Sequence, residues 1–184
     1  MIRVLSVLLV LALPLPALAQ PSLVILVRHA ERDTAPARDP VISVAGRARA
    51  EALRVALANA GIGSVVTTQY QRTRLTAGPL LDSLKLSPIT VAAASPVSSH
   101  AESVAAAVRA RPAGEVVLVV GHSNTIPAII AALGGPRLPD LCDSEYSKLF
   151  LLEFSGPGAP RFVQASHGAP DAPDAGGCQR TMSR

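Results

Sequence analysis

The chain has almost no aromatic residues, no tryptophan and few charges. Phe, Tyr and Trp make up 3% of its 184 residues, and Asp, Glu, Lys and Arg make up 16%. A core must therefore be built from Ala, Val and Leu, the usual filling between helices and a parallel sheet. The basic residues form no dense block, and the formal net charge is only +4. This balance argues against a nucleic-acid-binding protein.

Metal-binding patterns are also lacking. No cluster of Cys or carboxylate residues has ligand spacing around His29 or His122, so we expect neither a metal nor another cofactor. The only two cysteines are Cys142 and Cys178. In an oxidising compartment an even pair favours a disulfide, although two unpaired cysteines are the alternative.

The one long apolar stretch lies at the N-terminus, and it is too short to span a bilayer. Arg3 precedes an apolar run over residues 4–13, and residues 17–19 read Ala-Leu-Ala. This pattern predicts a signal peptide over residues 1–19; the alternative is an uncleaved membrane anchor. We therefore expect a periplasmic or secreted protein with no stable membrane insertion after cleavage. Its domain would cover residues 20–165, followed by a flexible tail over residues 166–184, which is rich in Ala, Gly, Pro and Asp.

Strand-like apolar runs alternate with helical patterns along the rest of the chain. This alternation predicts an α/β fold, a three-layer α/β/α sandwich with a mainly parallel central sheet. Arg49 is expected on the polar side of the first helix, and Ser99 with Glu102 resembles a capping box at the start of the third. Strands are expected at residues 22–27, 64–68, 89–92, 115–120, 148–154 and 161–164, and helices at residues 43–60, 73–84, 101–110 and 126–133.

Two of the buried strands end in reactive side chains. Residues 22–27 run directly into Arg28 and His29, and residues 115–120 run through Gly121 into His122. Ligands of parallel sheets bind at the carboxyl ends of strands. We therefore expect both segments to lie at the same edge of the sheet.

The first segment has the chemistry of a phosphoryl-transfer site. An imidazole such as that of His29 can attack phosphorus if its other nitrogen is tied to a backbone carbonyl in one tautomer. The guanidinium of Arg28 can bind phosphate oxygens in a bidentate manner. A histidine at the end of a strand is, however, more often structural than nucleophilic.

The second segment and a third one offer further contacts for an anion. His122 and Ser123 lie at a strand-to-helix turn, where free backbone N–H groups favour a bound phosphate. Arg72 follows the strand predicted at residues 64–68 and could reach the same edge of the sheet. The alternatives are that His122 caps its helix and that Arg72 lies on a solvated helix face.

Taken together, these segments resemble the histidine phosphatase superfamily, which has the phosphoglycerate-mutase-like fold. The resemblance covers nearly all of residues 22–154. The matching segments, in order, are Arg28-His29-Ala30; Ile42-Ser43-Val44-Ala45-Gly46; Arg72 with Thr76-Ala77; and Gly121-His122.

The resemblance implies a phosphomonoester hydrolase that needs no metal and acts on a small phosphorylated substrate. His29 would form a transient phosphohistidine, and Arg28, Arg72 and His122, with Ser123 nearby, would hold the phosphoryl group. The match is weakest at the proton donor to the leaving group, for which Glu102, Glu31 and His100 compete. The loops at residues 34–41 and 93–99 are expected to select the substrate.

Two other functions fit parts of the pattern. Residues 121–125 resemble the nucleophile elbow of an α/β-hydrolase, with Ser123 as the nucleophile. That esterase would need a later histidine, and His167 in the predicted tail is the only one. A non-catalytic or very slow phosphate-ligand-binding protein on the same fold is the second alternative.

Overall fold

The computed structural model describes residues 20–156 and 158–173. The predicted signal peptide and Cys178, the expected partner of Cys142, lie outside these residues. Within the described ranges, no helix combines the length and the apolar character that a bilayer crossing requires.

A six-stranded sheet forms the centre of the fold, in the order β3-β2-β4-β1-β5-β6. The strands β1, β2, β3 and β4 are parallel, whereas β5 and β6 form an antiparallel pair at one side. The strand bounds are β1 Leu23–Arg28, β2 Ile62–Thr67, β3 Ile89–Thr90, β4 Val116–Gly121, β5 Lys148–Glu153 and β6 Arg161–Ser166.

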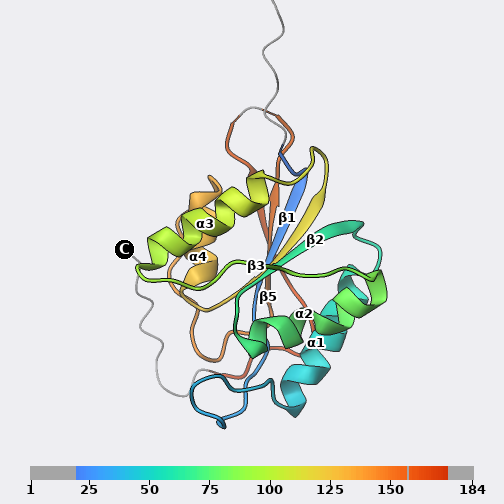
Figure 1. Cartoon of the computed structure of the whole chain (residues 1–184), viewed down its shortest axis with the longest axis vertical. Helices are drawn as coiled ribbons and strands as arrows, with labels where there is room; N and C mark the ends of the chain where they lie inside the picture. Colours follow the sequence, from blue (N-terminus) through green and yellow to red (C-terminus); the bar gives the residue numbers. More distant parts are fainter. Residues whose placement is uncertain (1–19, 157, 174–184) are drawn as a thin grey trace, which may run out of the picture.

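Four helices cover the two faces of this sheet, which gives the predicted three layers. In Figure 1, α3 and α4 lie on one side of the strands and α1 and α2 on the other. The helix bounds are α1 Val44–Leu57, α2 Gln71–Leu84, α3 Val97–Arg109 and α4 Thr125–Ala132. The predicted mixed α/β sandwich is confirmed.

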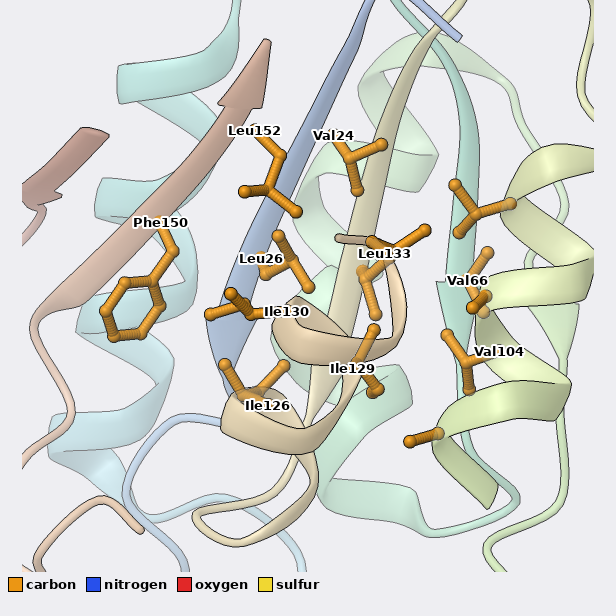
Figure 2. Close-up of a cluster of buried hydrophobic side chains, with 14 of the residues drawn as sticks. Val24, Leu26, Val66, Val104, Ile126, Ile129, Ile130, Leu133, Phe150 and Leu152 are labelled. Atoms are coloured by element: carbon orange, nitrogen blue, oxygen red, sulfur yellow. The ribbon is translucent and has the colours of Figure 1, made fainter. Parts of the chain in front are cut away.

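The sheet separates the two large clusters of the core, because side chains alternate between the two faces along β1. Val24 and Leu26 belong to the cluster beneath α3 and α4, and Ile25 and Val27 to the cluster beneath α1 and α2. Figure 2 shows the first cluster, in which the isoleucines of α4 face the strands. All four strand residues are at most 1% exposed, so β1 is a rigid support for the residues that follow it.

Helix α3 begins earlier than the sequence pattern predicted. Its N-cap is Pro96, and no side chain caps it, so the capping box expected from Ser99 and Glu102 is wrong. Both residues lie inside the helix, where their backbone N–H groups are no longer at a free end; Ser99 N, for instance, donates to Pro96 O at 3.1 Å.

The start of the predicted tail is packed against the domain. β6 continues to Ser166, and His167 is 5% exposed. Arg49 donates to the carbonyls of His167 and Ala169 at 3.0 and 2.9 Å, and the carboxylate of Asp171 accepts from the backbone N–H of Ser147 at 2.7 Å. The ordered part of the chain therefore extends beyond the boundary predicted at residue 165.

Arg49 itself is not on a solvated helix face. Arg49 is only 4% exposed, and its guanidinium group forms an ion pair with the carboxylate of Glu31 at 2.7 Å. The sequence pattern put Arg49 outside the apolar positions of α1, but it did not predict this burial. The partners that bury it come from the loop after β1 and from the segment after β6, which the periodicity of α1 cannot reveal.

Candidate active site

The register of two neighbouring strands brings His29 and His122 together. β1 and β4 are parallel, and Arg28 pairs with Gly121 at their ends. The residue that follows each strand is a histidine, His29 after β1 and His122 after β4. The backbone N–H of His29 donates to the carbonyl of Gly121 at 2.9 Å. The two imidazole rings lie 5.4 Å apart between centroids. The expected meeting of these segments at one edge of the sheet is thus found.

His29 is held in a single tautomer by its neighbour. Its Nδ1 lies 2.8 Å from the carbonyl oxygen of Ala30, and a carbonyl can only accept, so Nδ1 carries the proton. Nε2 is left with its lone pair. Burial lowers the pKa of His29 to about 3, with smaller contributions from the positive charge of Arg28 and Arg72. The ring is therefore neutral at physiological pH.

His122 adopts the opposite tautomer. Arg72 lies with its Nη2 3.3 Å from Nδ1 of His122, and Thr68 has its Oγ1 3.2 Å from Nε2. Because guanidinium only donates, Nδ1 accepts and Nε2 carries the proton that is donated to Thr68. Burial, followed by the charge of Arg72, lowers the pKa of His122 to about 3.

The two arginines of the sequence prediction are both near the histidines, but they are held differently. The Nη1 of Arg28 donates to the carbonyls of Cys142, Asp143 and Glu145 at 2.7, 3.2 and 3.2 Å. Arg72 contacts His122 and lies 3.9 Å from a carboxylate oxygen of Asp39. Arg28 therefore holds the segment after α4 in place, and it also adds a positive charge to the site.

Each of these arginines lies against a tyrosine, and the chain has only two tyrosines. The guanidinium carbon of Arg28 is 4.1 Å from the ring centre of Tyr146, and that of Arg72 is 4.3 Å from the ring centre of Tyr70. Such cation–π contacts hold the planar groups in place. Sequence reasoning missed both tyrosines, although their scarcity was a usable signal.

Thr76 connects the two sides of the site. Its hydroxyl accepts from the backbone N–H of Ala30 at 2.8 Å and donates to the carbonyl of Arg72 at 2.7 Å. One buried hydroxyl thus sets the position of the loop after His29 relative to the first turn of α2.

A cavity of about 450 Å³ opens at this edge of the sheet. Both loops that were expected to select the substrate contribute to its wall, through Ala37, Arg38, Pro40, Ala93, Ala94 and Val97. The other lining residues are Arg28, His29, Arg32, Tyr70, Arg72, His122, Ser123, Asn124, Thr125 and Asp143. Arg32, Arg38 and Asp143 were not among the site residues named from sequence.

None of the three proton-donor candidates lines this cavity. Glu31 is paired with Arg49, whose hydrogen bonds help to lower the pKa of Glu31 against the opposing effect of burial. Glu102 lines a different cavity, of about 470 Å³, between α3 and α4. His100 is 1% exposed, and its Nδ1 contacts the carbonyl of Ala92 at 3.1 Å. Among the described residues, Asp143 is the only carboxylate in the wall.

Within the described part of the chain, no group of three or more His, Cys, Asp and Glu side chains is arranged to hold a metal ion. The ionised side chains that line the cavity are mainly those of arginines. Guanidinium groups bind oxyanions through fixed pairs of N–H donors.

Three solved structures share this fold. The protein histidine phosphatase SixA, solved with tungstate, has a TM-score of 0.61 and 19% identity over 78% of this chain and 96% of its own. The mycobacterial glucosyl-3-phosphoglycerate phosphatase Rv2419c has a TM-score of 0.59 and 17% identity, over 79% and 97%. Bacillus stearothermophilus YhfR has a TM-score of 0.58 and 18% identity, over 76% and 94%.

Sequence comparison gives a family match over part of the chain. No curated protein matches the sequence. A family model does match: that of the histidine phosphatase superfamily (branch 1), over residues 24–95, which include His29 and Arg72. The fold and the order of the site segments agree with this match. The chain is therefore similar to the histidine phosphatase superfamily over residues 24–95, and it shares its fold with the solved structures described above.

Proposed function

We propose that the protein is a phosphomonoester hydrolase that transfers the phosphoryl group to Nε2 of His29 and then to water. The observation that carries this proposal is the state of His29. The ring lines the cavity, is neutral, and has its Nδ1 proton committed to the carbonyl of Ala30. Nε2 is then the only ring nitrogen that can attack a ligand.

In the first step, the Nε2 lone pair forms a bond to phosphorus while the bond from phosphorus to the leaving oxygen breaks. The leaving oxygen takes up a proton from solvent. The ring becomes cationic, and the hydrogen bond from Nδ1 to Ala30, which favours the charged form of His29, stabilises it. In the second step, water attacks phosphorus and gives up a proton to solvent, while the P–N bond breaks and its electron pair returns to Nε2.

The positive groups around His29 have distinct roles in this proposal. Arg72 is placed to bind phosphoryl oxygens, and His122 orients it by accepting a hydrogen bond at Nδ1. Arg28 adds fixed charge beside the nucleophile, and Ser123 lies in the same wall. Charge that develops on the phosphoryl oxygens is thereby stabilised without help from bulk water.

The leaving group receives little help from the protein. Of the carboxylates in the described ranges, only Asp143 lines the cavity, and its side chain is fully solvent-exposed and 3.6 Å from Arg28. We therefore expect the enzyme to favour substrates whose leaving group departs without strong acid catalysis. The two relatives named as phosphatases, and the tungstate bound to SixA, support a phosphatase on this fold.

The test is hydrolysis of 4-nitrophenyl phosphate by the purified protein. The wild type should release phosphate, and His29→Ala should reduce kcat by about 10³-fold or more, because the nucleophile is gone. Ser123→Ala should stay within about tenfold of the wild type, since Ser123 would lose at most one contact to phosphate. Activity in His29→Ala together with its loss in Ser123→Ala would overturn the proposal in favour of the esterase.

A further inference from the structure

Two arginines of the cavity have no role in the proposed phosphoryl transfer. Arg32 and Arg38 both come from the loop between β1 and α1, and both line the cavity beside His29 and Arg72. Among the described residues, neither side chain forms an ion pair or a hydrogen bond. By contrast, Arg28 and Arg72 have the contacts given above.

The loop that carries these arginines is anchored close to each of them. Arg32 forms a backbone bridge with Ile42, and the N–H of Asp33 donates to the carbonyl of Val41 at 2.9 Å. Asp39, the residue after Arg38, accepts at its carboxylate from the backbone N–H of Gln71 at 3.0 Å. The backbone therefore places both guanidinium groups at the cavity, although their side chains are solvent-exposed.

The cavity has more positive charge than one phosphoryl group requires. Four guanidinium groups line it, against the single lining carboxylate of Asp143. The pKa values of Arg28 and Arg72 are both lowered, chiefly by burial. The positive charge of Arg32 adds to the lowering in both, which shows that these like charges repel one another. Gathering such charges is unfavourable unless a bound anion compensates them.

We propose that Arg32 and Arg38 form a second anion-binding subsite, which holds a carboxylate or phosphate on the leaving-group side of the substrate. This inference rests on the proposed function, because it assumes that the first phosphoryl group lies between His29 and Arg72. The substrate class it names is a phosphomonoester that carries a second negative charge, bound through guanidinium groups as carboxylates and phosphates commonly are.

The experiment compares matched pairs of aryl phosphates. The ortho, meta and para isomers of carboxyphenyl phosphate carry the second charge, and the corresponding carboxamides have nearly the same shape without it. The value measured is the ratio of kcat/KM for carboxylate over carboxamide. The proteins are the wild type, Arg32→Gln, Arg38→Gln, the double variant, and Arg74→Gln. Arg74 is an exposed residue of α2 outside the cavity wall, so its variant controls for the lost charge.

For at least one isomer, the wild type should favour the carboxylate by about tenfold, the effect of one hydrogen bond to a charged group. The double variant should bring that ratio close to one, while turnover of unsubstituted phenyl phosphate stays within about threefold. Arg74→Gln should keep the wild-type ratio. Phenylene bisphosphates in place of the carboxyphenyl phosphates distinguish a phosphate-sized second group from a carboxylate.

Other outcomes would overturn the inference in distinguishable ways. A wild-type ratio near one for every isomer excludes the second subsite and leaves the phosphatase proposal intact. An equal loss with phenyl phosphate and with the carboxylates in Arg32→Gln makes Arg32 part of the phosphoryl site instead. If the wild type hydrolyses none of these esters, the proposed function and this subsite fall together.

Discussion

The imidazole rings of His29 and His122 lie 5.4 Å apart, with their planes at 64°. Each ring is neutral, and the two hold their protons on opposite nitrogens, because Ala30 accepts from one and Arg72 donates to the other. This arrangement leaves Nε2 of His29 unprotonated beside a guanidinium group. In the proposed function, a nucleophile and a phosphate-binding cation are thus close together before any substrate binds.

Arg72 is expected to be the most sensitive of the anion-binding residues. Arg72→Gln removes the contact with His122 and the charge facing the phosphoryl group, so kcat/KM for 4-nitrophenyl phosphate should fall about 10²–10³-fold. Arg74→Gln, which removes an exposed charge from the same helix, should stay within about twofold of the wild type. Similar losses in both variants would mean that Arg72 acts only through the general charge of the surface.

Glu102 should have no part in protonating the leaving group, since it lines the cavity between α3 and α4. Glu102→Gln should hydrolyse both 4-nitrophenyl phosphate and an alkyl phosphate such as glycerol phosphate within about twofold of the wild type. For every protein tested, the alkyl ester should be much the poorer substrate, because its leaving group needs a proton. Selective loss of the alkyl reaction in Glu102→Gln would identify Glu102 as the acid.

Parts of this site could be predicted from the sequence, because local patterns determine them. The apolar runs that form β1 and β4 end directly before Arg28 and before the turn at His122. Parallel pairing of these two strands therefore predicts that Arg28, His29 and His122 lie at the same edge of the sheet. The wall residues Arg32 and Arg38 could not be found in this way. Their position depends on the path of a loop, which is fixed by contacts with Ile42 and Gln71.

The differences from the sequence prediction have two separate causes. The burial of Arg49 could not be predicted, because the helical periodicity of α1 contains no information about Glu31 or the carbonyl groups after β6. The start of α3 was misplaced because Ser99 and Glu102 have capping-box spacing, while the helix actually begins after Pro96. The burial of Arg49 thus depends on contacts elsewhere in the chain, whereas the start of α3 is set locally at Pro96.

Gly46 should be required for the position of the loop that carries Arg32 and Arg38. A β-carbon at Gly46 would overlap the carbonyl oxygen of Glu31, so the loop or the helix would have to shift. Gly46→Ala should lower the free energy of unfolding by about 1–3 kcal/mol, measured by urea denaturation. The matched control is Gly78→Ala in α2, where a β-carbon meets nothing within 4 Å.

Gly78→Ala should raise the free energy of unfolding by about 0.5–1 kcal/mol, because alanine forms helices more readily than glycine. The opposite signs for the same substitution separate a steric effect at Gly46 from a general effect of glycine replacement. Equal effects at the two sites would contradict the close packing of Gly46 against Glu31.

His167 should make the stability of the fold depend on pH. Burial, and then the charge of Arg49, lowers the pKa of His167 from 6.5 to about 4. Below pH 6.5 the unfolded chain therefore binds a proton that the folded chain excludes, and stability falls as the pH falls from 6.5 towards 4. Above pH 6.5 this contribution to stability is fully present.

Replacing His167 with Leu removes the titrating group, along with two buried ring nitrogens that have no hydrogen-bond partner. The drop in the free energy of unfolding between pH 7.5 and pH 5 should be smaller in His167→Leu than in the wild type. His29, His100 and His122, whose pKa values are also lowered, should contribute to the dependence that remains. An unchanged pH profile in the variant would show that His167 titrates normally in the folded protein.

The proposed role of His29 as the nucleophile is tested most directly by trapping the phosphorylated enzyme. Purified protein is mixed with phenyl [³²P]phosphate, quenched within milliseconds in alkali and digested, and the labelled peptide is identified. A phosphoramidate at His29, stable to alkali and released by acid, is the expected result. Label on Ser123 or another hydroxyl, stable to acid, would contradict the account.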